Sequence, residues 1–210
     1  MVNPQSAGVN ALNEQRSTTS KRTYQKVKRA EDECRTRERI VDAAEYLHGT
    51  LGPANTTVSA VAGQAGVTRA TVYRHFASEE ALFLACSRQW LSRQRLPEPG
   101  SWGSIGDPTQ RLRTGLMDIY DFYRSGGQML ERTHRDVDVV PSVVVAARRA
   151  RERLWLDTLL APQASRRKAV RAAVAHATAF PTWQSLCGAQ GLTHRSAVEL
   201  MVGMVEHIPR

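Results

Sequence analysis

Several features of common enzyme and secreted-protein classes are scarce or missing in this chain of 210 residues. It has three cysteines, Cys34, Cys86 and Cys187, with no CxxC pair and no histidine at metal-ligand spacing, which argues against a disulfide framework and against a zinc site. No run of about 18 apolar residues occurs, and no basic start leads into a short apolar stretch. We therefore expect a cytoplasmic protein with no membrane partner.

Catalytic signatures are also missing. The chain contains no GxSxG, HExxH, P-loop or GxGxxG motif. The nearest cluster of acidic and histidine residues is His134 with Asp136 and Asp138, and a solvated helix end explains it better than a catalytic site does. We expect no enzyme activity, no metal and no cofactor. An enzyme that uses a DNA-binding motif for docking is an alternative class of function, and the residues support it only weakly.

What the chain has is a basic charge, a net +9 with a pI of about 10.1. A charge of this sign favours a polyanion such as nucleic acid as partner. The excess is divided almost equally between the residues before and after position 95, so charge alone does not locate a binding surface.

The stretch Thr56–Phe76, TTVSAVAGQAGVTRATVYRHF, organises the first part of the chain. Apolar residues recur in it at the spacing of one helix face: Val58, Val61, Ala62 and Ala65. Gly66 follows where helices commonly end in the left-handed conformation, and Thr68 can cap a second helix at Arg69–His75. Two short helices, a tight turn and a basic, hydroxyl-rich outer face together indicate a helix-turn-helix.

The flanking segments supply the further packing surface that two short helices need. Helical spacing upstream comes from Ile40, Ala43, Ala44 and Leu47, and Ser78 can cap a downstream helix whose apolar side holds Leu82, Phe83 and Cys86. The order of these segments, with AGVTRATVYRHF and then SEEALF, resembles the DNA-binding domain of the TetR family of repressors over roughly residues 36–90. Beyond residue 95 only length and helical character are similar.

The resemblance implies an all-α fold with two domains. A three-helix helix-turn-helix DNA-binding domain would occupy residues 34–95, and a helical ligand-binding and dimerisation domain residues 96–210. Residues 1–33 are polar and basic, and we expect a flexible arm there because few apolar groups offset the cost of ordering it. The arm is either a solvated tail or a phosphate-binding segment that uses Lys21, Arg22, Lys26, Lys28 and Arg29.

The second helix of the motif fits the major groove of DNA, where residues of its N-terminal half reach base edges. We expect Arg69 to contact guanine and Ala70 or the Thr71 methyl group to lie against a thymine methyl, while later positions and the start of the preceding helix suit phosphates. Tyr73 could instead be a packed aromatic, and Arg74 a solvated charge. The family resemblance implies DNA contacts at the same positions. The full predicted set is Thr57, Thr68, Arg69, Ala70, Thr71, Tyr73, Arg74 and His75.

One position departs from the family pattern. The family usually has a phosphate-binding lysine where this chain has Glu79, and a carboxylate there would repel the DNA backbone. No phosphate role is assigned to Glu79. We expect Glu79→Lys to tighten DNA binding equally at all sequences.

The rest of the chain has the pattern of successive helices. Proline and glycine between Trp90 and Pro108 predict a linker, and Gly126-Gly127 predicts a break in the amphipathic helix that follows it. A further helix is expected from Val140-Pro141 to a point before Pro162. The last two helices span about residues 166–208, with a kink at Pro181 in the first. The family resemblance implies that they pair with a second copy, which gives a homodimer that binds a palindromic double-stranded DNA operator.

The middle helices would enclose a cavity for a small-molecule effector, as in the resembled family. The candidates for its wall combine apolar bulk with hydrogen-bonding tips: Met117, Tyr120, Tyr123, His134, Trp155, His176 and Trp183. Each could equally be ordinary core or surface. The favoured function is a dimeric transcriptional repressor released from its operator by a ligand. The alternative is a DNA-binding regulator without a small-molecule ligand, controlled by a protein partner or acting as an activator.

Overall fold

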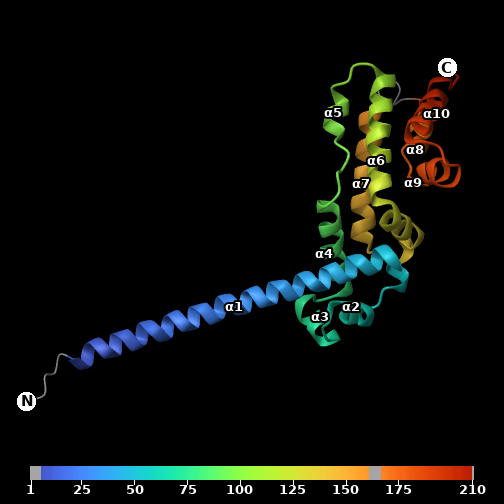
Figure 1. The fold of residues 1–210 in the computed structure, drawn as a ribbon. Coiled ribbons are helices and arrows are strands. Elements are labelled where there is room, and N and C mark those ends of the chain that lie inside the picture. Colours follow the sequence, from blue (N-terminus) through green and yellow to red (C-terminus); the bar gives the residue numbers. More distant parts are fainter. Residues whose placement is uncertain (1–5, 161–166, 210) are drawn as a thin grey trace, which may run out of the picture.

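The fold was examined in a computed structural model, which describes the backbone of residues 6–160 and 167–209 and the side chains of those residues from position 25 onward. Helices make up most of the described ranges and no strand occurs in them, so the predicted all-α class is confirmed. Among the same residues, no helix combines the length and the apolar character needed to cross a bilayer. A long first helix projects from a bundle formed by the remaining helices (Figure 1).

The N-terminal bundle consists of the end of α1 (Ser6–Thr50), α2 (Val58–Ala65), α3 (Arg69–His75) and α4 (Glu79–Ser92). Its core holds the apolar residues predicted from helical spacing, including Ile40, Ala44, Val61, Val72, Phe76, Leu82 and Cys86. Helix α4 is also tied to α1 by charge, since the guanidinium of Arg93 donates to Asp42 at 3.1 Å and to Glu45 at 3.0 Å. The predicted helix-turn-helix is thus held against two longer helices.

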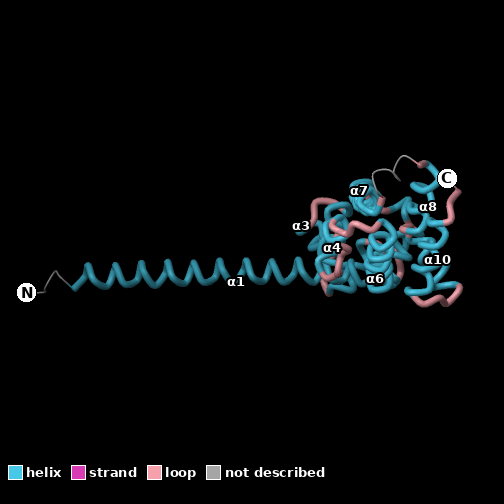
Figure 2. The backbone as a smooth tube through the Cα atoms, turned by 90° about the horizontal axis from the view of Figure 1, so that it is seen from above, coloured by secondary structure: helices cyan, strands magenta, loops and turns pink. Residues whose placement is uncertain are grey.

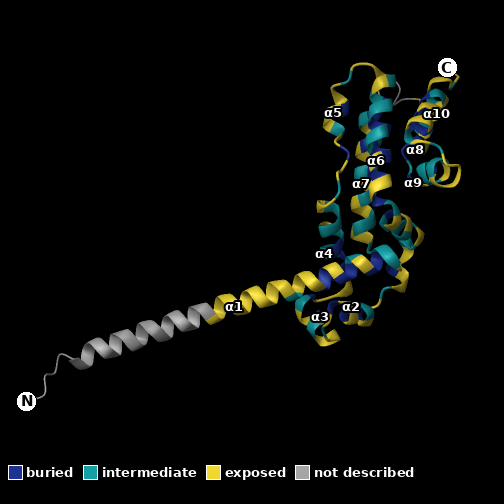
Figure 3. Ribbon diagram, in the orientation of Figure 1, coloured by how far each residue is buried: buried dark blue, intermediate teal, exposed yellow. Residues whose placement is uncertain are grey.

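Most of the segment predicted to be a flexible arm is helical in the structure. Residues 6–33 belong to α1, which runs without interruption across the expected boundary at residue 33 (Figures 1 and 2). A helix that is already nucleated extends one residue at a time at little cost, and the segment has no proline after Pro4 to stop it. Side chains 25–35 are exposed, whereas burial begins at Ile40 (Figure 3). Residues 1–5 and the side chains of Lys21 and Arg22 lie outside the described residues.

The proline- and glycine-rich linker also holds more structure than expected. A short helix, α5 (Pro99–Gly103), interrupts it, and the side chain of Trp102 is fully buried. The indole nitrogen of Trp102 donates to the Asp118 carboxylate at 2.7 Å. Trp102 is large and aromatic, and its polar atom has a hydrogen-bond partner, so its burial stabilises this short helix. Composition alone would predict an irregular linker here.

Helix α6 (Pro108–Arg135) is continuous, so the break expected at Gly126-Gly127 is wrong. A Cβ atom at Gly126 would lie 2.8 Å from Leu130 Cδ1 and 3.0 Å from Trp90 Cζ2. Glycine is therefore present because α4 packs closely against α6 there, and the packing outweighs the loss of helix propensity.

The remaining helices are α7 (Ser142–Leu159), α8 (Lys168–Ala177), α9 (Phe180–Trp183) and α10 (His194–Glu206), with short helical turns η1 (Pro53–Asn55) and η2 (Val137–Val139) and a π-helical turn η4 (Gln184–Ala189). Pro181 does not kink a long helix. Helix α8 ends at Ala177, and Pro181 lies in the first turn of α9, where its missing N–H costs nothing. Position 162 and the predicted start of the dimer helices at 166 lie outside the described residues.

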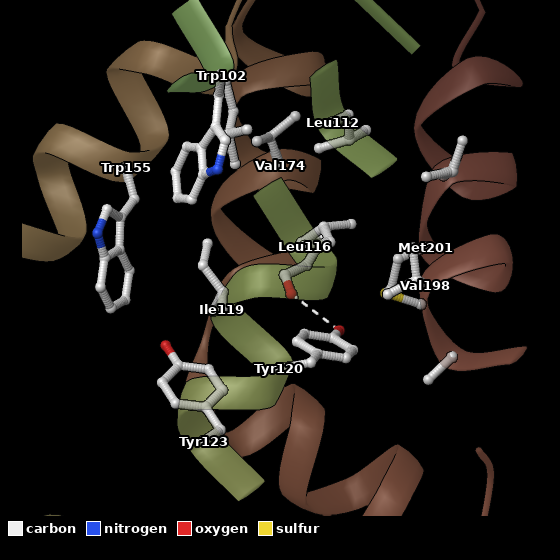
Figure 4. Packing of buried hydrophobic residues seen from close by; sticks show 14 of the residues in the cluster. Trp102, Leu112, Leu116, Ile119, Tyr120, Tyr123, Trp155, Val174, Val198 and Met201 are labelled. Atoms are coloured by element: carbon white, nitrogen blue, oxygen red, sulfur yellow. Dashed lines mark hydrogen bonds between the residues drawn. The ribbon is translucent and has the colours of Figure 1, made fainter. Parts of the chain in front are cut away.

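The C-terminal core lies between α6, α7, α8 and α10 (Figure 4). Two tyrosines of α6 hold the C-terminal end of α8 against α6. The Tyr120 hydroxyl donates to the Ala177 carbonyl at 3.0 Å, and the Tyr123 hydroxyl donates to the Thr178 carbonyl at 2.8 Å. These bonds satisfy the last carbonyl groups of α8, which have no partner inside the helix.

The two parts of the chain meet where α1 ends. The Arg132 guanidinium donates to the Gly49 carbonyl at 2.8 Å, and that of Arg135 donates to the Leu51 carbonyl at 3.2 Å. The Asp136 carboxylate accepts the Ala54 amide at 3.1 Å. Gly52 passes beside Arg135 and Asp136 with φ of 92°, a conformation and a closeness that only glycine allows. The end of α6 is therefore joined to the loop that precedes the helix-turn-helix.

Candidate nucleic-acid interface and ligand cavity

The turn between α2 and α3 has the geometry that its sequence predicts. The Thr57 hydroxyl accepts the Ala60 amide at 3.1 Å and caps α2, and the Thr68 hydroxyl accepts the Thr71 amide at 3.2 Å and caps α3. Gly66 between them is left-handed, with φ of 64°. Two side-chain caps and one left-handed glycine fix the direction in which α3 leaves the bundle.

Helix α3 has one buried and one exposed side. Val72 is 1% exposed and packs into the core, whereas Tyr73 is 44% exposed. The predicted DNA-contacting residues of α3 and its cap are exposed, except Thr71 and His75, which are half-buried. Tyr73 is therefore not a packed aromatic, and the predicted residues lie together on one short stretch of surface.

Charge on this surface is available to a polyanion. Neither Arg69 nor Arg74 forms an ion pair within the described residues, so both guanidinium groups can donate to base edges or phosphates. Glu79 lies nearby in the first turn of α4, exposed, where it stabilises the positive end of that helix. Nε2 of His75 is buried without a hydrogen-bond partner in the described part of the chain.

A cavity of about 330 Å³ lies between α1, α4, α6 and α7. Its wall is mostly apolar, with Phe83, Trp90, Leu130, Val140 and Val144 among its residues. The size is at the lower end of the range found for small-molecule sites. Helix α4 follows α3 after only three residues. The cavity is therefore next to the helix-turn-helix along the chain.

Burial alters two side chains beside this cavity. It lowers the pKa of His48 to about 4 and raises the pKa of the Cys86 thiol to about 12. The two side chains are in contact, with His48 Nδ1 3.3 Å from Cys86 Sγ. His48 is therefore neutral at neutral pH and Cys86 is a protonated thiol, so neither is a charged ligand-binding group.

None of the seven residues predicted for the pocket lines this cavity. Tyr120, Tyr123 and Trp155 are buried in the C-terminal core (Figure 4), which Met117 and Trp183 flank. His134 stacks on Phe180 with ring centroids 4.5 Å apart, and burial lowers its pKa to about 4. His176 is exposed on α8. Contact of any of them with a ligand remains an untested prediction.

Comparison with known proteins identifies the helix-turn-helix. The family model for bacterial regulatory proteins of the TetR family matches residues 40–86, which are the end of α1, the motif and the first part of α4. This part of the chain is thus similar to the N-terminal DNA-binding segment of TetR-family regulators. The match covers the buried core of the N-terminal bundle and the exposed face of α3, which are the features that position a recognition helix.

Part of the chain is also similar to two proteins named as transcriptional regulators. Two curated proteins of Mycobacterium tuberculosis strains, both named as uncharacterized HTH-type transcriptional regulators, are 49% identical to the chain over 79 residues. The aligned part is 38% of this chain and 39% of each relative. The chain thus spans about two fifths of the length of these relatives.

Solved structures show that the TetR fold extends over most of the chain. A TetR-like transcriptional regulator from Rhodococcus sp. RHA1 superposes with a TM-score of 0.55 at 20% identity, over 81% of this chain and 93% of that one. NalD, named as the secondary repressor of a multidrug efflux pump in Pseudomonas aeruginosa, gives 0.54 at 22% identity, over 84% and 96%. At this identity the likeness concerns the fold alone.

Sequence reasoning missed the arginines of this cavity, Arg88, Arg148 and Arg151. Helical spacing on α7 would have placed Arg148 and Arg151 on one face with Val144, at i, i+4 and i+7, but nothing in the sequence shows that this face meets α4. Among the described residues, no group of three or more histidine, cysteine or acidic side chains is placed to hold a metal ion.

Proposed function

We propose that the protein is a dimeric cytoplasmic repressor that binds a palindromic DNA operator through α3 and leaves it when a small molecule binds. The observation that carries the proposal is the outer face of α3, where Arg69, Tyr73 and Arg74 are exposed beside the buried Val72. The TetR family match supports the same function.

Base contacts are assigned to the first turn of α3. Arg69 has the donors for a bidentate contact with guanine, and such a contact is worth about 1–3 kcal/mol of discrimination against a wrong base. Thr57 and Tyr73 lie at the edges of this surface, where they suit phosphates and fix the register without contributing sequence information.

A second copy is needed because α3 has only seven residues and covers few base pairs. The last helices offer a surface for it: α10 exposes Leu200 at 46% and Met204 at 52%, and the alanines 169 and 172 of α8 are exposed. Exposed apolar side chains on neighbouring helices support pairing through α8 and α10. The two α3 helices would then meet half-sites about 34 Å apart or a multiple of this.

The position of the cavity supports release by a ligand. Helix α4 contributes Phe83, Cys86 and Trp90 to its wall, and α4 is joined directly to α3. A ligand that fits better when α4 is displaced favours a state in which the α3 helices are wrongly spaced for DNA. The name of NalD as a repressor supports repression as the sign of regulation.

The experiment is footprinting of the purified protein on genomic fragments, including the DNA that flanks its own gene, at several salt concentrations. Arg69→Ala removes the proposed base contact, and Arg153→Ala, an exposed arginine on α7, removes the same charge elsewhere. We expect a palindromic footprint with two protomers per site, lost in the first variant and kept in the second.

Binding that ignores sequence and survives Arg69→Ala would contradict the proposal, because the basic composition alone would then account for it. A footprint that no effector candidate changes would leave the DNA-binding function and favour a regulator controlled by a protein partner.

A further inference from the structure

The charged residues in the cavity wall all have one sign. Arg88 of α4 and Arg148 and Arg151 of α7 line it, and the wall contains no aspartate or glutamate. The remaining wall is largely apolar, with valines at 140, 143, 144 and 145. Cationic groups beside an apolar surface are costly unless an anion compensates them.

Arg151 is the most confined of the three. Its guanidinium lies over the rings of Phe122 and Trp155, 5.8 and 5.7 Å from their centroids, and Nε is buried with no hydrogen-bond partner among the described residues. Burial lowers its pKa, which indicates that the surroundings oppose its charge. An unpaired donor on a half-buried cation is a group that a ligand can satisfy.

No carboxylate of the described residues forms an ion pair with these arginines. Neither Arg148 nor Arg151 forms an ion pair in the described ranges. Glu152, the adjacent acidic residue of α7, is not part of the cavity wall; burial raises its pKa, and the charges of Arg148 and Arg151 oppose that rise. One carboxylate outside the wall faces several guanidinium groups, so an excess of positive charge at the cavity is left for a bound molecule.

We propose that the cavity takes a monocarboxylate with an apolar tail. Arg148 and Arg151 hold the carboxylate, and the tail lies among Trp90, Val140 and Val144. A guanidinium matches a carboxylate with two parallel N–H donors, so the pair gives both orientation and affinity. This inference rests on the proposed function in taking the cavity as the effector site, and it adds the class of effector.

The test compares three probes with the same ten-carbon tail and different heads: decanoate, decanol and decyltrimethylammonium. Binding to the full-length protein is measured by calorimetry below the concentration at which each probe aggregates. Trp90 lies in the wall, so a change in tryptophan fluorescence gives a second measure of occupancy. We expect decanoate to bind at least tenfold more tightly than decanol, and the cation to bind least.

Variants locate the head group. Arg151→Met should weaken decanoate binding by about tenfold to a hundredfold and Arg148→Met by about tenfold, since hydrogen bonds to charged groups are worth about 1.5–3 kcal/mol. Arg149→Met, an exposed arginine on the same helix, should leave it unchanged. Because Arg151 also packs on two aromatic rings, the melting temperature of each variant is measured, and Arg148→Met provides the test if Arg151→Met does not fold.

The outcomes separate this inference from the proposed function. Equal affinities for decanoate and decanol, binding of none of the probes, or binding that both variants leave unchanged would each overturn the carboxylate assignment, while operator footprints would still decide the DNA-binding function. Decanoate binding that fails to release the operator would support the carboxylate site and contradict release by this ligand.

Discussion

Two histidines occupy surroundings that oppose their protonation. His48 is 7% exposed, its ring centroid lies 4.6 Å from that of Phe83, and burial lowers its pKa to about 4. His134 has the same shift from burial, with Arg148 as a further cause. Both are neutral in the folded protein at pH 5, whereas a histidine in an unfolded chain, with a pKa of about 6.5, is then mostly charged.

The pH dependence of stability follows from this difference. The unfolded state binds protons as the pH falls below about 6.5, and the folded state does so only near pH 4, so stability is full above this window and is lost as the pH falls through it. Between pH 7.5 and pH 5, His48 should account for a loss on the order of 2 kcal/mol. His48→Met removes the group, and urea unfolding of both proteins at the two pH values should show a smaller loss in the variant.

An equal loss in His48→Met and in the wild type would mean that His48 can take up a proton without unfolding. Slopes of the unfolding curves against urea must match between the proteins, because a change in slope would indicate an altered unfolded state.

At the scale of elements, the two adjacent glycines of α6 have opposite surroundings. Gly126 faces Trp90 and Leu130, and a Cβ atom there would come within 3.0 Å of both, whereas nothing lies within 4 Å of a Cβ atom at Gly127. We expect Gly127→Ala to raise the free energy of unfolding by about 0.5–1 kcal/mol through helix propensity. Gly126→Ala should lower it by about 1 kcal/mol or more through overpacking.

Urea midpoints of the two variants against the wild type measure this difference directly. Stabilisation by both substitutions would contradict the close packing of α4 on α6, and destabilisation by both would indicate that α6 is not helical at this point.

Local signals in the sequence were sufficient for some elements and not for others. The caps at Thr68 and Ser78 and the left-handed Gly66 act through atoms a few residues away, so the helix-turn-helix could be predicted completely. The helical turn around Trp102 and the continuity of α6 at Gly126 depend on contacts between distant segments. Composition predicts a loop around Trp102 and a break at Gly126 because it carries no information about contacts with distant segments.

The contrast between local signals and contacts of distant segments also explains why one candidate site could be predicted from the sequence and the other could not. The exposed face of α3 follows from helix periodicity within seven residues, whereas the cavity wall combines residues of α1, α4, α6 and α7. The side chains predicted to line an effector pocket, Met117 with aromatic residues and histidines, are not in this wall, and two of them, Tyr120 and Tyr123, donate hydrogen bonds to backbone carbonyls of the core. Which faces of four helices meet is a property of their packing, and no single segment determines it.

At the scale of the whole molecule, α1 extends far beyond the bundle (Figure 2). Its 45 residues correspond to about 68 Å of helix, and side chains 25–35 are exposed. Deletion of residues 1–30 should therefore reduce helix content, measured by circular dichroism, and change the free energy of unfolding by less than about 0.5 kcal/mol. A large loss of stability would show that this segment packs on the protein.

Operator binding by the same truncated protein distinguishes the two roles left open for this segment. Unchanged affinity and an unchanged salt dependence would leave it a solvated helix. A weaker salt dependence would mean that its basic residues release counterions from DNA, about one ion for each phosphate that the segment neutralises in the full-length protein.

The junction between α6 and the end of α1 has a consequence for how such proteins diversify. Arg132 and Arg135 donate to carbonyl groups of Gly49 and Leu51, and Asp136 accepts the amide of Ala54. On the side of the helix-turn-helix these three bonds use main-chain atoms of residues 49, 51 and 54, which most side chains leave available. Substitutions at these positions other than proline at 54 therefore keep the bonds. The outer face of α3 can change in sequence while this attachment to α6 is kept.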